Sequence, residues 1–318
     1  MKAVFLDFAT VDADGLDVSP LRDLTESFRT YDSTPATEVA ERIDGAEFVY
    51  LNKARMTREI IENAGSLRFI GLVATGVDNV DLAAARKHGV AVSNIRAYCT
   101  NSVVEHVFAM LLSLMHSLGR YHDAVRQGEW AHADNFCMLD YPIRELAGRT
   151  LGVIGYGELG RRVAEVAGAF GMEILVSARP GSGVVGEGRT PFEDVIRRSD
   201  VISLHCPLTD ETEGLIGASA LSKMKDTAVL INTARGGLVD SRALVDALAG
   251  GTIAAAGIDV LSEEPPENGD PLLDYRGDNL IVTPHIAWAT AEARQNAINE
   301  LAANVAAYLA GEKRNRVD

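Results

Sequence analysis

The sequence predicts an α/β protein that contains two parallel sheets, each covered by helices. Over residues 1–94, short runs of β-forming residues alternate with polar or helical stretches, which is typical of βα units. A second series of six apolar runs between residues 151 and 285 alternates in the same way. A glycine-rich turn follows the first of these six runs, and this favours a doubly wound nucleotide-binding domain for the second half of the chain.

The predicted strands and helices follow from residue patterns along the chain. The strands of the first series are expected at 3–8, 48–52, 69–74 and 90–94, and those of the second at 151–155, 173–178, 200–206, 228–234, 253–260 and 279–285. The apolar segment 103–119 predicts a buried helix, with Ser102 and Glu105 at the spacing of a capping box. The apolar positions Ile298, Leu301, Val305 and Leu309 predict a last helix that ends at Gly311 and packs on the first domain.

Composition and charge restrict the classes of partner. With 318 residues, 47% of them hydrophobic, the chain has enough length for two cored domains. Its net charge of −15 disfavours nucleic acid and anionic membranes as partners, so an anionic substrate must be held by a local group of donors. The N-terminal apolar run is too short for a secretory signal, and three cysteines without C-x-x-C spacing suit a reducing cytoplasm. His205 and Cys206 are adjacent without further ligands nearby, so no metal site is expected.

The glycine-rich turn has the G-x-G-x-x-G spacing of a dinucleotide site. Gly155 permits a tight turn, Gly157 lets the backbone approach a pyrophosphate, and Gly160 lets the following helix pack closely on the strand. The N–H groups at the start of that helix are free to bind phosphate oxygens. The turn residues Tyr156, Glu158 and Leu159 are therefore included in the cofactor site.

The next strand ends without the acidic residue that usually binds the ribose 2′-hydroxyl of NAD. In its place the chain has Ala178, followed by Arg179. A carboxylate there would repel a 2′-phosphate, whereas a small residue and a guanidinium accommodate one. The sequence therefore favours NADP(H), with NAD(H) as the alternative; in the competing interpretation Arg179 only stacks on the adenine.

Three polar residues follow three successive strands of the second series. Arg235, Glu264 and His285 are each unremarkable alone, but together they are the groups that reduction of a 2-keto acid requires. A guanidinium holds the carboxylate and polarises the carbonyl. An imidazole exchanges protons near neutral pH, and a carboxylate bonded to its other nitrogen orients the ring. The same residues serve oxidation, so the sequence leaves the physiological direction open.

These motifs together resemble the D-isomer-specific 2-hydroxyacid dehydrogenases from about residue 45 onward. The resemblance is carried by ATGVDNVDL, TNSVVEH, LGVIGYGELG, LHCPLTDET, INTARGGLVD, GIDVLSEEPP and TPHIAWAT. It implies a split, flavodoxin-like substrate domain formed by residues 1–98 and 289–318, a Rossmann domain over residues 99–288 that binds NAD(P), and a homodimer. It also implies that Arg235, Glu264 and His285 form the catalytic triad.

The resemblance extends to substrate and cofactor contacts. It implies that the backbone at Thr75 and Gly76 holds the substrate carboxylate, that Asp259 contacts the nicotinamide amide, and that Val103 packs near its ring. Further cofactor contacts are expected at Cys206, Pro207, Thr233 and Ala234.

Within the family, LNKARMT and HIAWAT are most similar to glycerate dehydrogenases that reduce hydroxypyruvate and glyoxylate. Lys53 is then either a substrate contact or a solvated surface lysine. Val77-Asp78-Asn79 follows the general family pattern and lacks the aromatic residue common in that subgroup, so the substrate stays open. A phosphite dehydrogenase on the same scaffold is the main alternative, and a nucleotide-sensing protein resembling the C-terminal binding co-repressors is a remote one.

Overall fold

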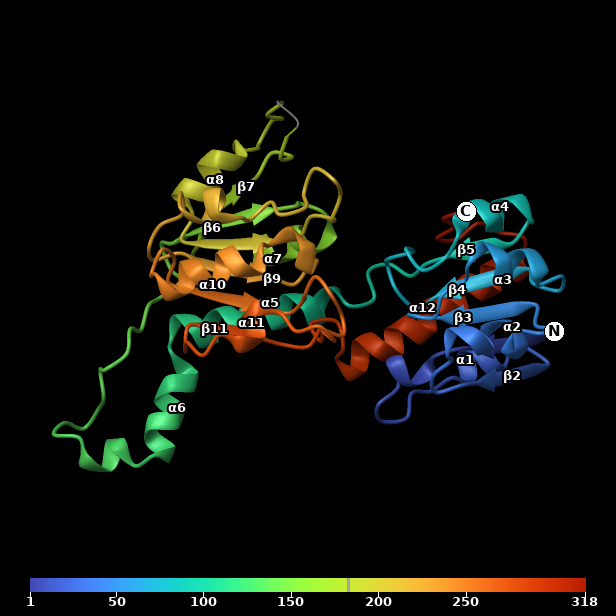
Figure 1. Ribbon diagram of the computed structural model, residues 1–318, viewed down its shortest axis with the longest axis horizontal. Helices are drawn as coiled ribbons and strands as arrows, with labels where there is room; N and C mark the ends of the chain where they lie inside the picture. Colours follow the sequence, from blue (N-terminus) through green and yellow to red (C-terminus); the bar gives the residue numbers. More distant parts are fainter. Residues whose placement is uncertain (182–183) are drawn as a thin grey trace. The chain divides into compact units, whose positions relative to one another are not determined.

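The computed structural model describes residues 1–181 and 184–318 and divides into two compact units (Figure 1). Unit 1 contains Met1–Cys99 together with Trp288–Asp318, and unit 2 contains Thr100–Ala287. Each unit is an α/β layer structure with one parallel sheet, as the alternation of apolar and polar segments predicts.

Unit 1 has a five-stranded parallel sheet in the order β2-β1-β3-β4-β5, the order of flavodoxin-like folds. Its strands are β1 (Lys2–Phe5), β2 (Ser27–Thr30), β3 (Phe48–Leu51), β4 (Phe69–Leu72) and β5 (Ala91–Ser93). Its helices are α1 (Ser19–Arg22), α2 (Val39–Arg42), α3 (Arg58–Asn63), α4 (Leu82–Lys87) and α12 (Ala291–Leu309), with 3-10 turns η1 (Phe8–Thr10) and η2 (Ala36–Glu38).

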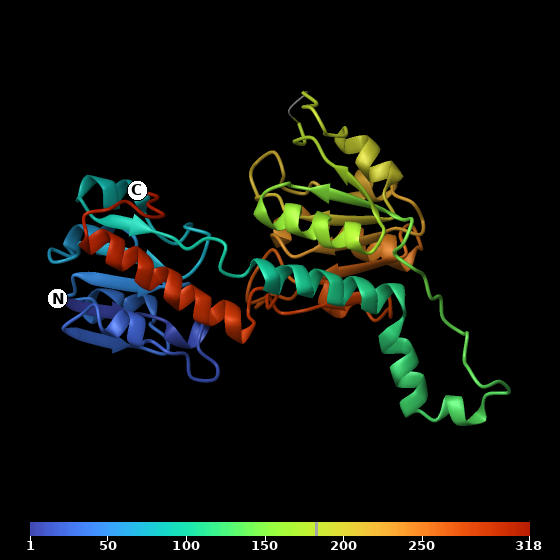
Figure 2. The same cartoon turned by 180° about the vertical axis from the view of Figure 1, so that it is seen from behind.

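Both faces of this sheet are buried. Along β1, Val4 belongs to the cluster under α3 and α4, whereas Ala3 and Phe5 belong to the cluster under α12. Helix α12 lies along that second face of the sheet (Figure 2). It approaches β4 so closely that a Cβ on Gly71 would stand 2.3 Å from Leu301 Cδ1, which explains a glycine inside a buried strand.

Unit 2 has a six-stranded parallel sheet in the order β11-β10-β9-β8-β6-β7. Its strands are β6 (Thr150–Ile154), β7 (Glu173–Val176), β8 (Val201–Leu204), β9 (Val229–Asn232), β10 (Ala255–Ile258) and β11 (Leu280–Val282). Its helices are α5 (Thr100–Met115), α6 (Leu118–Arg126), α7 (Glu158–Ala169), α8 (Phe192–Arg198), α9 (Ala218–Leu221), α10 (Ser241–Ala249) and α11 (Pro271–Asp274), with η3 (Glu129–His132) and η4 (Gly236–Leu238). All strands run in the same direction, but the order in which successive strands join the sheet reverses between β6 and β8, which is where doubly wound sheets bind ligands.

The helix predicted over 103–119 differs from the structure in two respects. It begins at Thr100, so Ser102 lies inside the helix and donates its hydroxyl to Ala287 O at 2.6 Å. The capping-box prediction for Ser102 and Glu105 is therefore wrong, because the serine bonds a distant loop. The helix also ends at Met115, and α6 starts at a bend of 61° after Ser117, which has φ +50°.

Strand β2 was not predicted from the sequence, because its residues SFRT are polar and it is an exposed edge strand. Over the described residues no single helix is long and apolar enough to cross a membrane; only the bent pair α5 and α6 has that length and composition jointly.

Candidate active site

The glycine-rich turn joins β6 to α7 beside the point where the strand order reverses. Gly155 has φ +95°, and a Cβ there would stand 2.4 Å from the backbone N of Cys206, just after β8. A Cβ on Gly160 would stand 2.0 Å from Gly155 O. At Gly157, in contrast, a Cβ would meet no protein atom within 4 Å. Two glycines thus permit contacts inside the protein, whereas the third leaves open space over the α7 N-terminus, as a bound pyrophosphate requires.

The other predicted cofactor residues of unit 2 lie at the same end of the sheet or on α5. Val103 is buried on α5, and Cys206 is buried directly after β8, where burial raises the pKa of its thiol. Thr233 follows β9, and its buried Oγ1 has no hydrogen-bond partner among the described residues. A buried hydroxyl without a partner is costly, so this atom fits a position that a ligand completes. Tyr156, Pro207 and Ala234 lie in the turns that follow these strands, and Glu158 and Leu159 are the first two residues of α7.

His205, just before Cys206, is a half-buried histidine that the predicted site leaves out. Its Nε2 lies 2.8 Å from the Ser203 hydroxyl, and desolvation of the ring lowers its pKa to about 4. The ring is therefore neutral at physiological pH, and its backbone packs against Gly155.

At the end of β7 the structure contains two arginines. Arg179 lies 3.9 Å from Glu211 in an exposed ion pair, and this contributes to the lowered pKa of Glu211, after hydrogen bonds from Thr209 and the Glu211 backbone. Arg189 lies with its guanidinium over the Tyr156 ring, 5.0 Å from the centroid. Arg189 was not among the residues predicted for the site, because it follows Arg179 by ten residues in an exposed loop.

Arg235 lies in a turn that follows β9, and the side chain of Asn232, the last residue of β9, holds this turn. Asn232 Nδ2 donates to Arg235 O at 2.9 Å, and Asn232 Oδ1 accepts from Ala234 N at 3.0 Å. The next residue, Gly236, packs on the loop after β10: a Cβ on it would lie 1.9 Å from the carbonyl carbon of Leu261. The guanidinium itself is exposed, so it is available to an anionic group.

His285 and Glu264 form the closest side-chain pair of the predicted triad. His285 Nδ1 lies 2.6 Å from Glu264 Oε2, and Glu264 Oε1 accepts the N–H of Leu261 at 2.9 Å. Each side chain is about one-third exposed, at 30% and 32%. With Nδ1 bonded to the carboxylate, Nε2 is the nitrogen left for proton exchange with a substrate.

The loop that carries His285 is held by Asp259, at the end of β10. His285 has φ +54°, a strained conformation for a non-glycine residue, and its N–H donates to Asp259 O at 2.7 Å. The Asp259 carboxylate is completely buried and accepts from Ile286 N, Ala287 N and the Thr283 hydroxyl at 2.9, 2.9 and 2.6 Å. The carboxylate therefore organises this loop, and the predicted contact of Asp259 with a nicotinamide amide stays a prediction.

In unit 1, a buried carboxylate holds the turn that carries Lys53. Asp7 accepts the N–H groups of Asn52, Lys53 and Ala54 at 2.9, 2.6 and 2.7 Å. Asn79 closes the other side of the turn by donating to Asn52 O and Ala54 O at 3.1 and 2.8 Å. The Lys53 side chain is exposed, so buried groups fix the backbone of a surface lysine.

A chain of buried amides holds Thr75, which precedes Gly76. Asn94 Nδ2 donates to Thr75 O at 2.7 Å, and Asn304 Nδ2 on α12 donates to Asn94 O at 2.8 Å. Arg314 Nη1 in turn donates to Asn304 Oδ1 at 2.6 Å. The segment after α12 therefore helps to fix the loop that the sequence analysis assigns to the substrate carboxylate.

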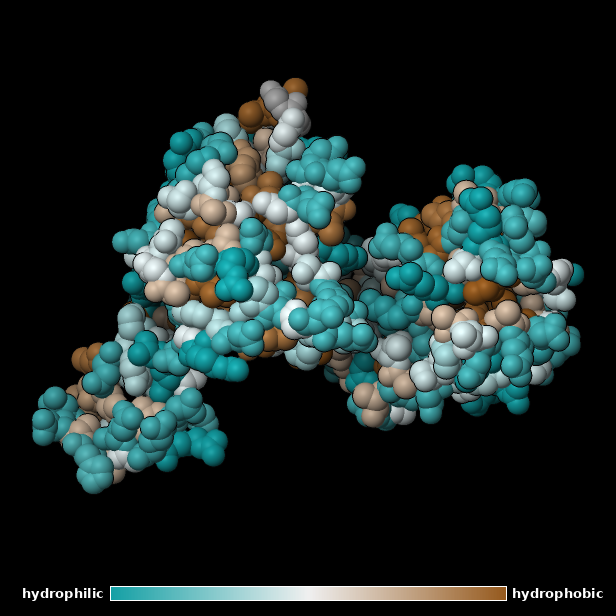
Figure 3. Space-filling view, in the orientation of Figure 1, coloured by the Kyte–Doolittle hydropathy of each residue, from teal (hydrophilic) through white to brown (hydrophobic). Residues whose placement is uncertain are grey.

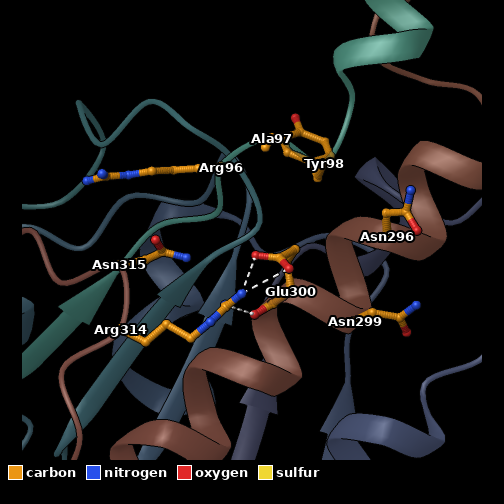
Figure 4. Close-up of a pocket in the computed structure, with 8 residues that line it drawn as sticks. All are labelled: Arg96, Ala97, Tyr98, Asn296, Asn299, Glu300, Arg314 and Asn315. Atoms are coloured by element: carbon orange, nitrogen blue, oxygen red, sulfur yellow. Dashed lines mark hydrogen bonds and ion pairs between the residues drawn. The ribbon is translucent and has the colours of Figure 1, made fainter. Parts of the chain in front are cut away.

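The same segment borders a hollow of about 420 Å³ in unit 1 (Figure 4). Arg314 Nη2 lies 3.0 and 2.8 Å from the two carboxylate oxygens of Glu300, and these contacts are drawn as dashed lines. The charge of this arginine is therefore neutralised within the protein. Arg96, Tyr98 and Asn296 also line the hollow.

The doubly wound sheet of unit 2 and its glycine-rich turn define a nucleotide-dependent dehydrogenase. Residues 108–287 match the family described as "D-isomer specific 2-hydroxyacid dehydrogenase, NAD binding domain". The chain belongs to this family, and it is an NAD(P)-dependent D-2-hydroxyacid dehydrogenase. The predictions of family, enzyme class and fold class are thereby confirmed.

Similar proteins cover the whole chain. The glycerate dehydrogenase of Methylorubrum extorquens is 44% identical, over 100% of this chain and 99% of that protein. The hydroxypyruvate reductase of Blautia hydrogenotrophica is 39% identical, over 100% of both chains. Among solved structures, an acyclic imino acid reductase in complex with NADPH and D-Arg has a TM-score of 0.85 and 29% identity, again over 100% of both chains.

Proposed function

We propose that this enzyme interconverts hydroxypyruvate and D-glycerate, or glyoxylate and glycolate, and that it uses NADPH in preference to NADH. The hydrogen-bonded pair of His285 and Glu264, at the same end of the sheet as the glycine-rich turn, carries this proposal. The relatives named glycerate dehydrogenase and hydroxypyruvate reductase support the choice of substrate.

The protein's own groups supply every part of the reaction except the hydride. A bound nicotinamide supplies the hydride that adds to the carbonyl carbon. Arg235 holds the substrate carboxylate and polarises the carbonyl with its fork of N–H donors. His285 donates a proton from Nε2 to the carbonyl oxygen, and Glu264 on Nδ1 stabilises the charged imidazole before the transfer. In oxidation the same histidine accepts the proton.

We assign substrate binding to residues 1–98 and 289–318, and cofactor binding to residues 99–288. In the first region, the N–H groups at Thr75 and Gly76 would bind the substrate carboxylate, and Lys53 would contact a polar group of the substrate. Because Asp7 and Asn79 fix the Lys53 turn from both sides, we favour the binding role of this lysine over that of a solvated surface residue.

The preference for NADPH rests on the end of β7. Ala178 is small and buried there, and Arg179 supplies a cation next to the position of the ribose. Glu211 already pairs with Arg179, so a 2′-phosphate has to compete with one exposed carboxylate at 3.9 Å. Exposed ion pairs contribute little, about 0–1 kcal/mol, so a phosphate can displace this one.

Initial rates with NADPH and NADH, each against hydroxypyruvate, glyoxylate and pyruvate, test this function. We expect NADPH-dependent reduction of hydroxypyruvate or glyoxylate, and we expect Arg179→Ala to raise the KM for NADPH about 10-fold or more while changing that for NADH little. A higher kcat/KM with NADH would overturn the cofactor assignment. Phosphite-dependent reduction of NADP⁺, without turnover of any keto acid, would replace the substrate assignment.

We also propose that the enzyme is a homodimer in the cytoplasm. Helix α6, η3 and the segment after it form an arm of unit 2 (Figure 1), on which apolar side chains are visible (Figure 3). Its large exposed residues are Leu118, Val125, Trp130, Phe136, Leu139 and Ile143, with Phe136 90% exposed. Exposed apolar patches of this kind mark contact surfaces, and the molar mass by light scattering tests the dimer. Among the described residues no disulfide bond joins two cysteines, which suits a reducing compartment.

A further inference from the structure

Arg189 lies close to the end of β7 although it is ten residues away from Arg179. Thr190 pairs with the end of β7, where its N–H donates to Val176 O at 2.8 Å. Ala178 N in turn donates to Thr190 O at 2.8 Å, and Ser177 and Thr190 form a parallel bridge. This pairing places Arg189 beside Ala178 and Arg179. These two residues occupy the position at which NAD-binding sites have an acidic residue for the ribose 2′-hydroxyl.

The side chain of Arg189 is directed to the glycine-rich turn. Its Cζ lies 5.0 Å from the centroid of the Tyr156 ring, a cation–π distance, and Tyr156 stands between Gly155 and Gly157. Among the described residues no carboxylate lies within 4.0 Å of this guanidinium, whereas Arg179 has Glu211 at 3.9 Å.

We infer that Arg189 binds the 2′-phosphate of NADP(H) together with Arg179, and that Tyr156 positions its guanidinium. The inference rests on the proposed preference for NADPH and adds a second cation to it. A phosphate monoester carries a charge of about −1.5 to −2 near neutral pH, and two guanidiniums match this charge. Because Arg189 is bound to a ring and not to an acid, it meets the phosphate without first breaking an ion pair.

Calorimetric titration with 2′,5′-ADP and with 5′-AMP tests the inference without requiring turnover. The first probe, 2′,5′-ADP, has a phosphate on the ribose 2′ oxygen, and 5′-AMP lacks it. We expect Arg189→Ala to weaken binding of 2′,5′-ADP by about 10-fold to 100-fold and binding of 5′-AMP by less than about 2-fold. Arg189→Lys keeps the charge but loses the fork, so its affinity for 2′,5′-ADP should lie between those of the wild type and the alanine variant.

Arg197→Ala provides a matched control, because Arg197 is an exposed arginine on α8 that pairs with Asp194 at 3.1 Å. It removes the same charge from the same unit and should leave both affinities unchanged. Equal losses of both probes in Arg189→Ala would overturn the inference in favour of adenine stacking, and no loss of either would overturn it outright. If the wild-type protein itself binds 2′,5′-ADP no more tightly than 5′-AMP, the proposed preference for NADPH fails instead.

Discussion

Unit 1 and unit 2 each place a buried aspartate carboxylate under a loop that carries a candidate active-site side chain. Asp7 accepts three consecutive N–H groups around Lys53, and Asp259 accepts two N–H groups and a hydroxyl around His285. Both carboxylates follow the end of a sheet strand, and the strand gives each of them a rigid backbone. The solution is the same in both units: an acid that cannot reach solvent replaces water as the partner of loop N–H groups.

The two loops differ in what the carboxylate holds in place. Asp7 fixes the backbone of the turn, whereas the exposed side chain of Lys53 can still change conformation. Asp7 therefore positions a binding group. Asp259 fixes a loop in which His285 has φ +54° and Nδ1 is already bonded to Glu264. That loop positions a reacting atom, which tolerates far less displacement. The comparison predicts that damage to the first carboxylate raises KM and damage to the second lowers kcat.

Of the two aspartate substitutions, Asp259→Asn is expected to have the larger effect. An amide offers one acceptor oxygen and places an NH₂ group against N–H donors, so the His285 loop loses its fixed geometry. We expect kcat to fall by about 10²-fold or more, with His285→Gln setting the lower limit because it removes the imidazole itself. Steady-state rates together with the dissociation constant of NADPH provide the measurement. An unchanged kcat with weaker cofactor binding would instead assign Asp259 to the nicotinamide amide.

A smaller effect is expected for Asp7→Asn. The KM for the keto acid should rise about 10-fold while kcat stays within about 2-fold, because the turn loosens without moving the reacting groups. In a Lys53→Met background the same substitution should add almost nothing to KM, since the residue it positions is gone. Additive effects on KM would mean that Asp7 has only a structural role. The accompanying loss of unfolding free energy, about 1–3 kcal/mol for unsatisfied N–H groups, is measured separately in urea.

Much of this architecture could be predicted from periodicity, and the exceptions have identifiable causes. Buried parallel strands are apolar throughout, so ten of the eleven strands were visible as apolar runs, whereas the polar edge strand β2 was not. The triad could be proposed because each member follows a strand. Asp7 fell inside the predicted strand 3–8 without a role, and Arg189 was not visible at all, because its neighbours in space come from tertiary pairing through Thr190.

The smallest effect is expected in acid, because the His205 ring of the unfolded chain binds a proton at a higher pH than the carboxylates do. Desolvation lowers its pKa from the ordinary value of 6.5 to about 4 in the folded protein, so the unfolded chain binds more protons between these values. The stability of the protein should therefore fall as pH decreases from about 6.5 towards 4. Carboxylates with lowered pKa values, such as Asp200 and Asp318, lose their contribution only as pH falls below about their ordinary value of 3.8. Urea unfolding at pH 7, 6 and 5 should show a decline in the wild type that is weaker in His205→Asn, whose amide can still bond the Ser203 hydroxyl. Parallel declines in the two proteins would mean that another group is responsible.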